Sequence, residues 1–248
     1  MGNLETQIKR ANKDFYDIVG DSYEEIDGRR SEGLAQYVAS RLKLISQETD
    51  GISMLDLGCG SGFVSRIAGD YFKSRAAMDI SSRILKAIRD NALLKITGDS
   101  DFIPVKSESF SCIAAFAVLH HSYSFEKMFN EIYRILKKGG RFYSDHDMDS
   151  FFYNRYKSLL KIYRKINDAK KHYLSKFNQL TEEIYNYSEF HQKGIPSDSI
   201  IKILNDIGFK DIRIEYHWYG LSPLTDRIFG EKSYKKGYAP LVRIIAVK

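Results

Sequence analysis

The stretch Met54-Leu-Asp-Leu-Gly-Cys-Gly-Ser-Gly62 decides the fold that we expect for this chain of 248 residues. Its first half completes an apolar run over residues 52–57, and a helical pattern over residues 64–72 follows its last glycine. Glycine allows tight turns and a close approach of the backbone to a ligand. A loop with Gly58, Gly60 and Gly62 between a strand and a helix is therefore typical of an α/β protein that binds a small molecule.

The same alternation of strands and helices continues along the chain. Strand-like runs occur at residues 76–80, 93–97, 112–117, 141–144, 209–216 and 241–247, and most of them are separated by helical patterns. We expect an α/β fold with a Rossmann-like, doubly wound, mainly parallel seven-stranded sheet and helices on both faces. In such sheets the ligand binds beyond the carboxyl ends of the strands.

Two regions depart from this alternation. Residues 1–46 contain only helical patterns, and we expect them to form an N-terminal helical cap. Residues 150–194 predict a helical insertion after the fifth strand, at the ligand edge, where it would act as a lid. Residues 47–149 and 195–248 would form the cofactor-binding domain itself. The first insertion helix carries one apolar stripe: Phe152, Tyr156, Leu159, Leu160, Tyr163 and Ile166. We expect the many tyrosines and phenylalanines of the insertion to be mostly core.

The glycine loop alone would also suit a nicotinamide dinucleotide. That cofactor favours the fingerprint G-x-G-x-x-G, whose third glycine is replaced here by Phe63. Asp79 ends the next strand, where a carboxylate can accept hydrogen bonds from ribose hydroxyls. The two features together favour a nucleoside-containing cofactor that is not a dinucleotide.

An ordered series of motifs carries a family resemblance. It comprises Asp56–Gly62, Met78–Ser81, Gly98-Asp99 with Ile103-Pro104, Phe110–Ile113, Val118–His121 and Arg134–Arg141. In this order the chain resembles the class I S-adenosylmethionine (AdoMet)-dependent methyltransferases, and within them the subgroup that includes the ubiquinone/menaquinone-biosynthesis type. The resemblance implies AdoMet as methyl donor and S-adenosylhomocysteine as product.

The resemblance also implies which residues bind the cofactor. Asp79 would hold the ribose, and Ile80 would pack on the adenine. Asp99 would accept from the adenine amino group, with the Ser100 amide on the ring, and Phe116 would lie beside the methionine end. The other implied cofactor residues are Asp56, Gly58, Cys59, Gly60 and Gly62 in the glycine loop, and Tyr16, Tyr23 and Arg30 in the N-terminal region.

Methyl transfer requires an acceptor held in line with the methyl group, and in some cases a base. Candidate side chains follow the fourth and fifth strands, and we select His121 and His146 because histidine is the natural base near neutral pH. Asp145, His146 and Asp147 could instead contribute to a metal site. Neighbouring strand residues point to opposite faces, so we expect that the three do not converge and that no metal is bound.

The charge distribution bears on the acceptor. The chain carries a net charge of +6, and residues 155–176 contain eight basic residues and one acid, Asp168. We expect a small-molecule acceptor, which could be anionic; the alternatives are an RNA-directed methyltransferase that uses this basic helix, and a non-catalytic AdoMet-fold binding protein. We expect a cytoplasmic protein for three reasons. The chain has only two cysteines, its N-terminus does not resemble a leader, and it has no apolar run of membrane-spanning length. The sequence leaves the oligomeric state open.

Overall fold

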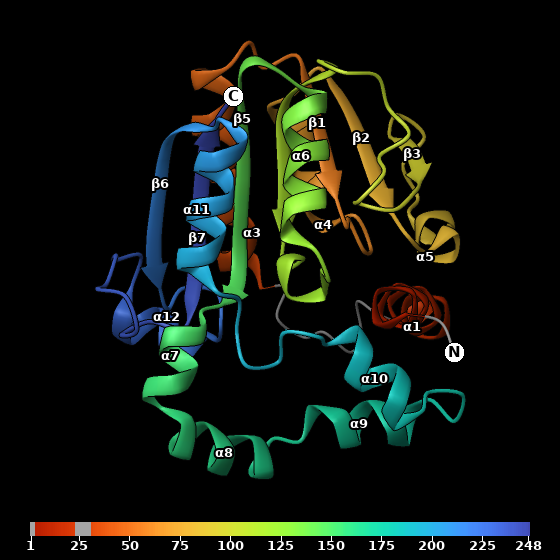
Figure 1. Ribbon diagram of the computed structural model, residues 1–248, viewed down its shortest axis with the longest axis vertical. Helices are drawn as coiled ribbons and strands as arrows, with labels where there is room; N and C mark the ends of the chain where they lie inside the picture. The colour runs from red at the N-terminus through yellow and green to blue at the C-terminus, as the bar shows by residue number, and fades with distance from the viewer. Residues whose placement is uncertain (1–2, 23–30) are drawn as a thin grey trace.

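The structure is a computed structural model that describes residues 3–22 and 31–248. Its centre is one seven-stranded sheet with the strand order β3-β2-β1-β4-β5-β7-β6 (Figure 1). Strand β7 pairs antiparallel with both of its neighbours, and the other pairs are parallel. The strand order reverses direction between β1 and β4, which opens a crevice at the carboxyl ends of these strands. The expected α/β fold is confirmed.

The elements follow each other in the expected alternation. The strands are β1 (Ser53–Leu57), β2 (Ser74–Asp79), β3 (Leu94–Thr97), β4 (Phe110–Phe116), β5 (Leu136–Met148), β6 (Lys210–His217) and β7 (Leu241–Val247). The helices around the sheet are α3 (Glu32–Glu48), α4 (Phe63–Ile67), α5 (Ser82–Ala87), α6 (Phe125–Ile135), α11 (Ser197–Ile207) and α12 (Pro223–Phe229), with the short 3-10 turns η1 (Gly20–Ser22), η2 (Ala68–Asp70) and η3 (Leu119–His121).

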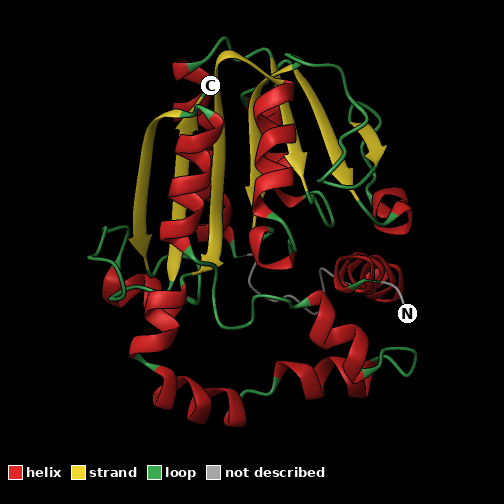
Figure 2. Cartoon of the chain, in the orientation of Figure 1, coloured by secondary structure: helices red, strands yellow, loops and turns green. Residues whose placement is uncertain are grey.

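Helices cover both faces of the sheet (Figure 2). On β4, Ile113 and Ala115 face the core beneath α6 and α11, whereas Cys112 and Ala114 face the core beneath α3 and α4. Successive strand residues point to opposite faces, so a strand buried on both sides is apolar throughout. This explains why the run 112–117 shows no polar alternation.

The N-terminal helix and the insertion lie beneath the carboxyl ends of the strands. Helix α1 (Leu4–Val19) is seen end-on beside α10, and α7 to α10 form an arc below the sheet (Figure 1). Phe15 and Val19 of α1 are buried against Leu180 of the insertion. The insertion helices are α7 (Ser150–Arg155), α8 (Lys157–Ile166), α9 (Ala169–Lys176) and α10 (Glu182–Ser188).

Two local expectations are wrong. The strand expected over residues 141–144 starts earlier, because α6 stops at Ile135 and β5 begins at Leu136. The amide of Gly139, at φ +75°, donates to the carbonyl of Lys248 at 2.9 Å, so pairing with the end of the chain extends the strand. The aromatic residues of the insertion are also only partly core: Phe152 is buried, but Tyr163 on α8 is 61% exposed.

Candidate functional site

The glycine loop is held against the next strand by its backbone. The amides of Gly58 and Cys59 both donate to the carbonyl of Met78, at 2.8 and 3.0 Å. Gly58 has φ +66°, and a Cβ atom there would lie 2.7 Å from a methyl carbon of Val118. Only glycine fits this turn without displacing its neighbour. The backbone therefore comes close to the carboxyl ends of both β1 and β4.

Two buried acids brace this loop. Asp79 accepts from the amide of Gly60 at 3.1 Å and from the amide of Ser81 at 2.9 Å. Burial raises the pKa of Asp79 to about 6, although these hydrogen bonds act in the opposite direction. Asp56 accepts from the amide and the hydroxyl of Ser65, at 2.9 and 2.6 Å, and so ties β1 to α4.

A cavity of about 100 Å³ lies beyond the carboxyl ends of β1, β2 and β4. The structure brings seven of the residues expected in the site together in its lining: Tyr16, Gly58, Asp79, Ile80, Asp99, Ser100 and His121. Asp56, Cys59, Gly60, Gly62, Phe116 and His146 are not part of that lining, and Tyr23 and Arg30 lie outside the described residues.

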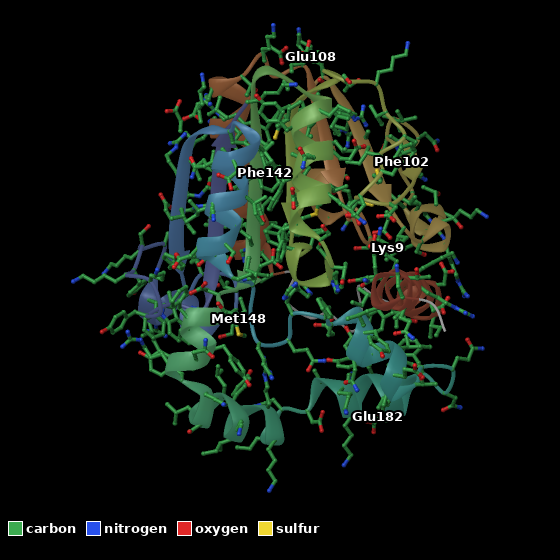
Figure 3. The ribbon with its side chains drawn as sticks, viewed as in Figure 1. Lys9, Phe102, Glu108, Phe142, Met148 and Glu182 are labelled. Atoms are coloured by element: carbon green, nitrogen blue, oxygen red, sulfur yellow. The ribbon has the colours of Figure 1, made fainter. Side chains whose placement is uncertain are left out.

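Helix α1 covers one end of the cavity with a charged cluster. The ammonium group of Lys9 lies 2.9 Å from a carboxylate oxygen of Asp99 and 2.6 Å from one of Asp101. Although partial burial acts in the opposite direction, these carboxylates raise the pKa of Lys9 above its usual value. Lys9 lies on the side of α1 that faces the sheet (Figure 3). Both oxygens of Asp99 are engaged, because the other accepts from the amide of Asp101 at 2.9 Å.

His121 connects three parts of the chain. Its Nε2 lies 2.9 Å from the hydroxyl of Tyr16 on α1, and its Nδ1 lies 2.5 Å from the carbonyl oxygen of Ser188 at the end of α10. The carbonyl requires a donor, so Nδ1 carries the proton and Nε2 accepts from Tyr16. Burial lowers the pKa of His121 to about 4, which keeps the ring neutral near pH 7. Both ring nitrogens are thus hydrogen-bonded in this structure, and the neutral ring links α1 to the end of α10.

A second polar cluster is buried around Asp145 at the end of β5. One carboxylate oxygen accepts from the hydroxyls of Tyr37 and Tyr143, each at 2.9 Å. The other lies 3.0 Å from Nδ1 of His146 and 2.7 Å from Nε2 of His217. Burial opposes ionisation, but the two imidazoles and their hydrogen bonds hold the pKa of Asp145 well below its usual value. Asp145 is therefore a carboxylate at neutral pH.

His146 departs from the strand geometry that the sequence suggested. At φ +69° it interrupts the alternation of side chains, so its ring turns back to Asp145 and stacks on Phe116, with ring centroids 4.2 Å apart. Asp147 points elsewhere and lies 2.6 Å from Nδ1 of His120. The three residues thus do not converge, but Asp145, His146 and His217 do, with donor atoms within 4.8 Å of one another. A divalent cation could be held there, although in this structure these groups bond to each other.

Residues 55–144 match the family model of a methyltransferase domain. This part of the chain thus carries a methyltransferase domain, and the chain is similar to class I AdoMet-dependent methyltransferases over most of its length. It is 20% identical to a mitochondrial 2-methoxy-6-polyprenyl-1,4-benzoquinol methylase of Dictyostelium discoideum, over 84% of this chain and 78% of the relative.

Solved structures share the fold of this methyltransferase. An AdoMet-dependent methyltransferase of Thermotoga maritima, described as a possible histamine N-methyltransferase, superposes with a TM-score of 0.64 at 16% identity, over 96% of this chain and 99% of the other. The second structure is phosphoethanolamine N-methyltransferase 2 of Haemonchus contortus, in complex with phosphomonomethylethanolamine and S-adenosylhomocysteine. It superposes with a TM-score of 0.57 at 18% identity, over 94% of this chain and 60% of the other.

The residues of the cavity fit AdoMet. At Gly58 the lining of the cavity is backbone, because no side chain fits there beside Val118. Asn12 and Ser122 are also lining residues, and their side chains are of a kind that can hydrogen-bond to a polar ligand. The carboxylate of Asp79 adds an acceptor suited to hydroxyl groups.

Several lining residues were not expected from the sequence. Lys9, Asn12 and Tyr16 lie on one face of α1, and only Tyr16 was selected. Their spacing of three and four residues is the available signal, but it identifies a shared helix face and not what that face covers. The part of the chain that the structure describes contains no helix long and apolar enough to cross a membrane.

Proposed function

We propose that this methyltransferase transfers the AdoMet methyl group to a small-molecule acceptor by direct displacement. The observation that carries the proposal is the covered cavity. Tyr16 and His121 both line it, and the insertion reaches them through the bond between His121 and Ser188. A polymer would need an open groove at the strand ends, so this cover favours a small acceptor over RNA. The similar proteins named as a benzoquinol methylase and as a phosphoethanolamine N-methyltransferase are consistent with it.

Bound AdoMet supplies an electrophilic methyl group on a positively charged sulfur. In our proposal Asp79 accepts from the ribose hydroxyls, Ile80 packs on the adenine, and Ser100 binds the ring edge through its amide. Asp99 reaches the adenine amino group by sharing its carboxylate with Lys9. The glycine loop, with Asp56 bracing it, presents backbone to the rest of the cofactor.

His146 lies outside the cavity lining, at the end of β5 beside Phe116, and we propose that an acceptor bound on that side of the site contacts it. Its ring stacks on Phe116, and its Nδ1 lies 3.0 Å from the ionised Asp145. A carboxylate beside an imidazole fixes the ring orientation and stabilises its protonated form. His146 could therefore take the proton of an acceptor hydroxyl as the methyl group is transferred. For an amine or a carbon acceptor it would serve to position the substrate.

We propose a positioning role for His121 instead of a catalytic one, because both of its ring nitrogens are engaged. Two cysteines, Cys59 and Cys112, are buried thiols. Together with the cofactor they favour the cytoplasm as the compartment, as proposed from the sequence.

The experiment is a measurement of S-adenosylhomocysteine formation with a panel of acceptors: a hydroquinone, a primary amine, a phosphorylated amino alcohol and unmodified transfer RNA. We expect turnover with one small-molecule class and none with RNA. Turnover with RNA alone would replace the proposal by the RNA-directed alternative. If no acceptor gives product while AdoMet binds, the chain is a non-catalytic binding protein.

The role of His146 is tested with the acceptor so identified. For a hydroxyl acceptor, His146→Asn should lower kcat by about a hundredfold, the lower range for loss of a general base, and leave the affinity for AdoMet unchanged. His191→Asn is the matched control, because His191 is a half-buried histidine that bonds to the carbonyl of Ser122 and not to Asp145. Equal losses in both variants would contradict a specific role for His146.

A further inference from the structure

Helix α8 exposes an apolar face. Leu159, Ile162, Tyr163 and Ile166 keep 65%, 60%, 61% and 76% of their surface in water. Their spacing places them on one side of the helix, and none of the ten residues of α8 is buried. Burying a leucine or isoleucine side chain is worth about 1.5–3 kcal/mol, so a protein gains little from leaving three of them and a tyrosine in water.

The other sides of α8 and α9 are basic. Lys157, Lys161 and Lys165 of α8 are exposed and form no ion pair with the described residues, whereas Lys170 of α9 pairs with Glu182 at 2.9 Å. Residues 155–176 contain eight basic residues and one acid, Asp168, so this segment has a net charge of +7. An apolar stripe and a high positive charge therefore occur on the same segment.

This segment lies at the outer margin of the molecule. Figure 2 shows α8 and α9 on the side of the arc away from the sheet, with no other element beyond them in this view. Arg164, whose guanidinium donates to the carbonyl of Gln192 at 2.7 Å, fixes the opposite side of α8 to the end of the insertion. The apolar side chains are therefore presented outward by a helix that is tied down at its back.

Charge and apolarity together select the partner. A basic helix with an apolar face is the pattern that lies in the interface of an anionic bilayer. The phosphates of nucleic acid would attract the lysines, but they would not bury the apolar side chains of Leu159 and Ile162. A second copy of this chain would bring two segments of +7 together. The observations favour lipid over both.

We propose that the exposed face of α8, together with its lysines, binds the surface of a membrane rich in anionic phospholipid. Leu159, Ile162, Tyr163 and Ile166 enter the boundary between head groups and acyl chains. The lysines of α8 and α9 lie near the phosphates. The segment thereby places the covered edge of the sheet next to the membrane without crossing it.

The test is co-sedimentation of the whole protein with vesicles. Vesicles of phosphatidylcholine alone are compared with vesicles that also contain about one-third phosphatidylglycerol. The wild type is compared with Leu159→Gln/Ile162→Gln. The matched control is Leu224→Gln/Ile228→Gln on α12, where the two side chains are 67% and 62% exposed. Because all four side chains lie in water, the folding of both variants should be preserved, and their circular dichroism spectra check this.

We expect the wild type and the α12 variant to bind the anionic vesicles, and the α8 variant to bind at least tenfold more weakly. Lys157→Glu/Lys161→Glu should also lose binding, and added salt should reduce it for the wild type. Failure of the folded wild type to bind anionic vesicles overturns the proposal, as does equal binding by the α8 variant. Retention on RNA at the same salt, unaffected by the α8 glutamines, would assign the basic segment to nucleic acid and not to lipid.

Discussion

The hydroxyl of Tyr16 lies 2.9 Å from Nε2 of His121, and through Nδ1 of the same ring it is linked to the carbonyl of Ser188. This chain of bonds joins α1, the loop after β4 and the end of the insertion over one cavity. The cover of this cavity is thus held by a neutral histidine between a phenol and a backbone carbonyl. Its stability should depend on the phenol.

Tyr16→Phe should therefore destabilise the protein and weaken AdoMet binding. The substitution leaves the buried Nε2 of His121 without a donor, which costs about 1–3 kcal/mol in the free energy of unfolding. Urea denaturation and calorimetry with AdoMet measure the two effects. Tyr123→Phe is the control, because Tyr123 lines the same cavity but is 41% exposed. If the two variants behave alike, the bond to His121 does not hold the cover.

The affinity for AdoMet should fall as the pH drops below about 6. Burial raises the pKa of Asp79 to about 6, so the acid loses its charge below that pH and becomes a weaker acceptor for ribose hydroxyls. If only the carboxylate form binds, affinity falls by about tenfold for each further pH unit. Calorimetry between pH 5 and pH 8 tests this. In Asp79→Asn the affinity should be lower and this dependence absent; an equally steep dependence in that variant would assign it to another group.

Gly58→Ala should abolish AdoMet binding. The new Cβ would lie 2.7 Å from Val118, at a backbone φ of +66°. Gly139→Ala separates the effect of the close contact from that of the positive φ. Gly139 has φ +75°, but no atom lies within 4 Å of the position that its Cβ would take. We expect a cost of about 1–2 kcal/mol from the backbone alone at Gly139, with normal AdoMet affinity, and a greater loss at Gly58. Partial recovery in Gly58→Ala/Val118→Ala would identify the close contact as the cause.

Asp145→Asn should unfold the protein at a markedly lower temperature. Removing one charge of a buried hydrogen-bonded cluster costs about 3–5 kcal/mol, because the histidines that faced it lose their partner. The pKa of Asp145 is lowered in the folded state, so its contribution is complete above the unfolded value of about 3.9 and is lost as the pH falls below it. Asp206→Asn, an exposed acid, is the control for thermal denaturation. Equal melting temperatures would show that the cluster is not needed for stability.

Much of the fold could be predicted because its signals are local. The apolar run before Gly58 and the acid Asp79 at the end of the next strand identified the glycine loop and its sheet edge. The start of β5 could not be predicted, because it depends on pairing between Gly139 and Lys248, which are far apart in the sequence. Sequence periodicity also cannot tell which side of α8 faces the protein.

The same distinction applies to the site. Gly58, Asp79 and Asp99 follow directly from motifs and line the cavity. Lys9 and Asn12 reach it only because α1 folds across the sheet edge. The ring of His146 turns back to Asp145 because this residue has a positive φ, which no local sequence pattern predicts. The site residues placed by a local backbone turn or by long-range packing could thus be identified only from the structure.

The central claim, that the cavity beside Gly58 and Asp79 binds AdoMet for methyl transfer, is tested most directly by calorimetric titration of the folded protein with AdoMet and S-adenosylhomocysteine. We predict saturable binding of both at one site per chain, and a loss of at least tenfold in Asp79→Ala. Absence of binding by the folded wild type, or an Asp79→Ala variant with unchanged affinity, would contradict the account.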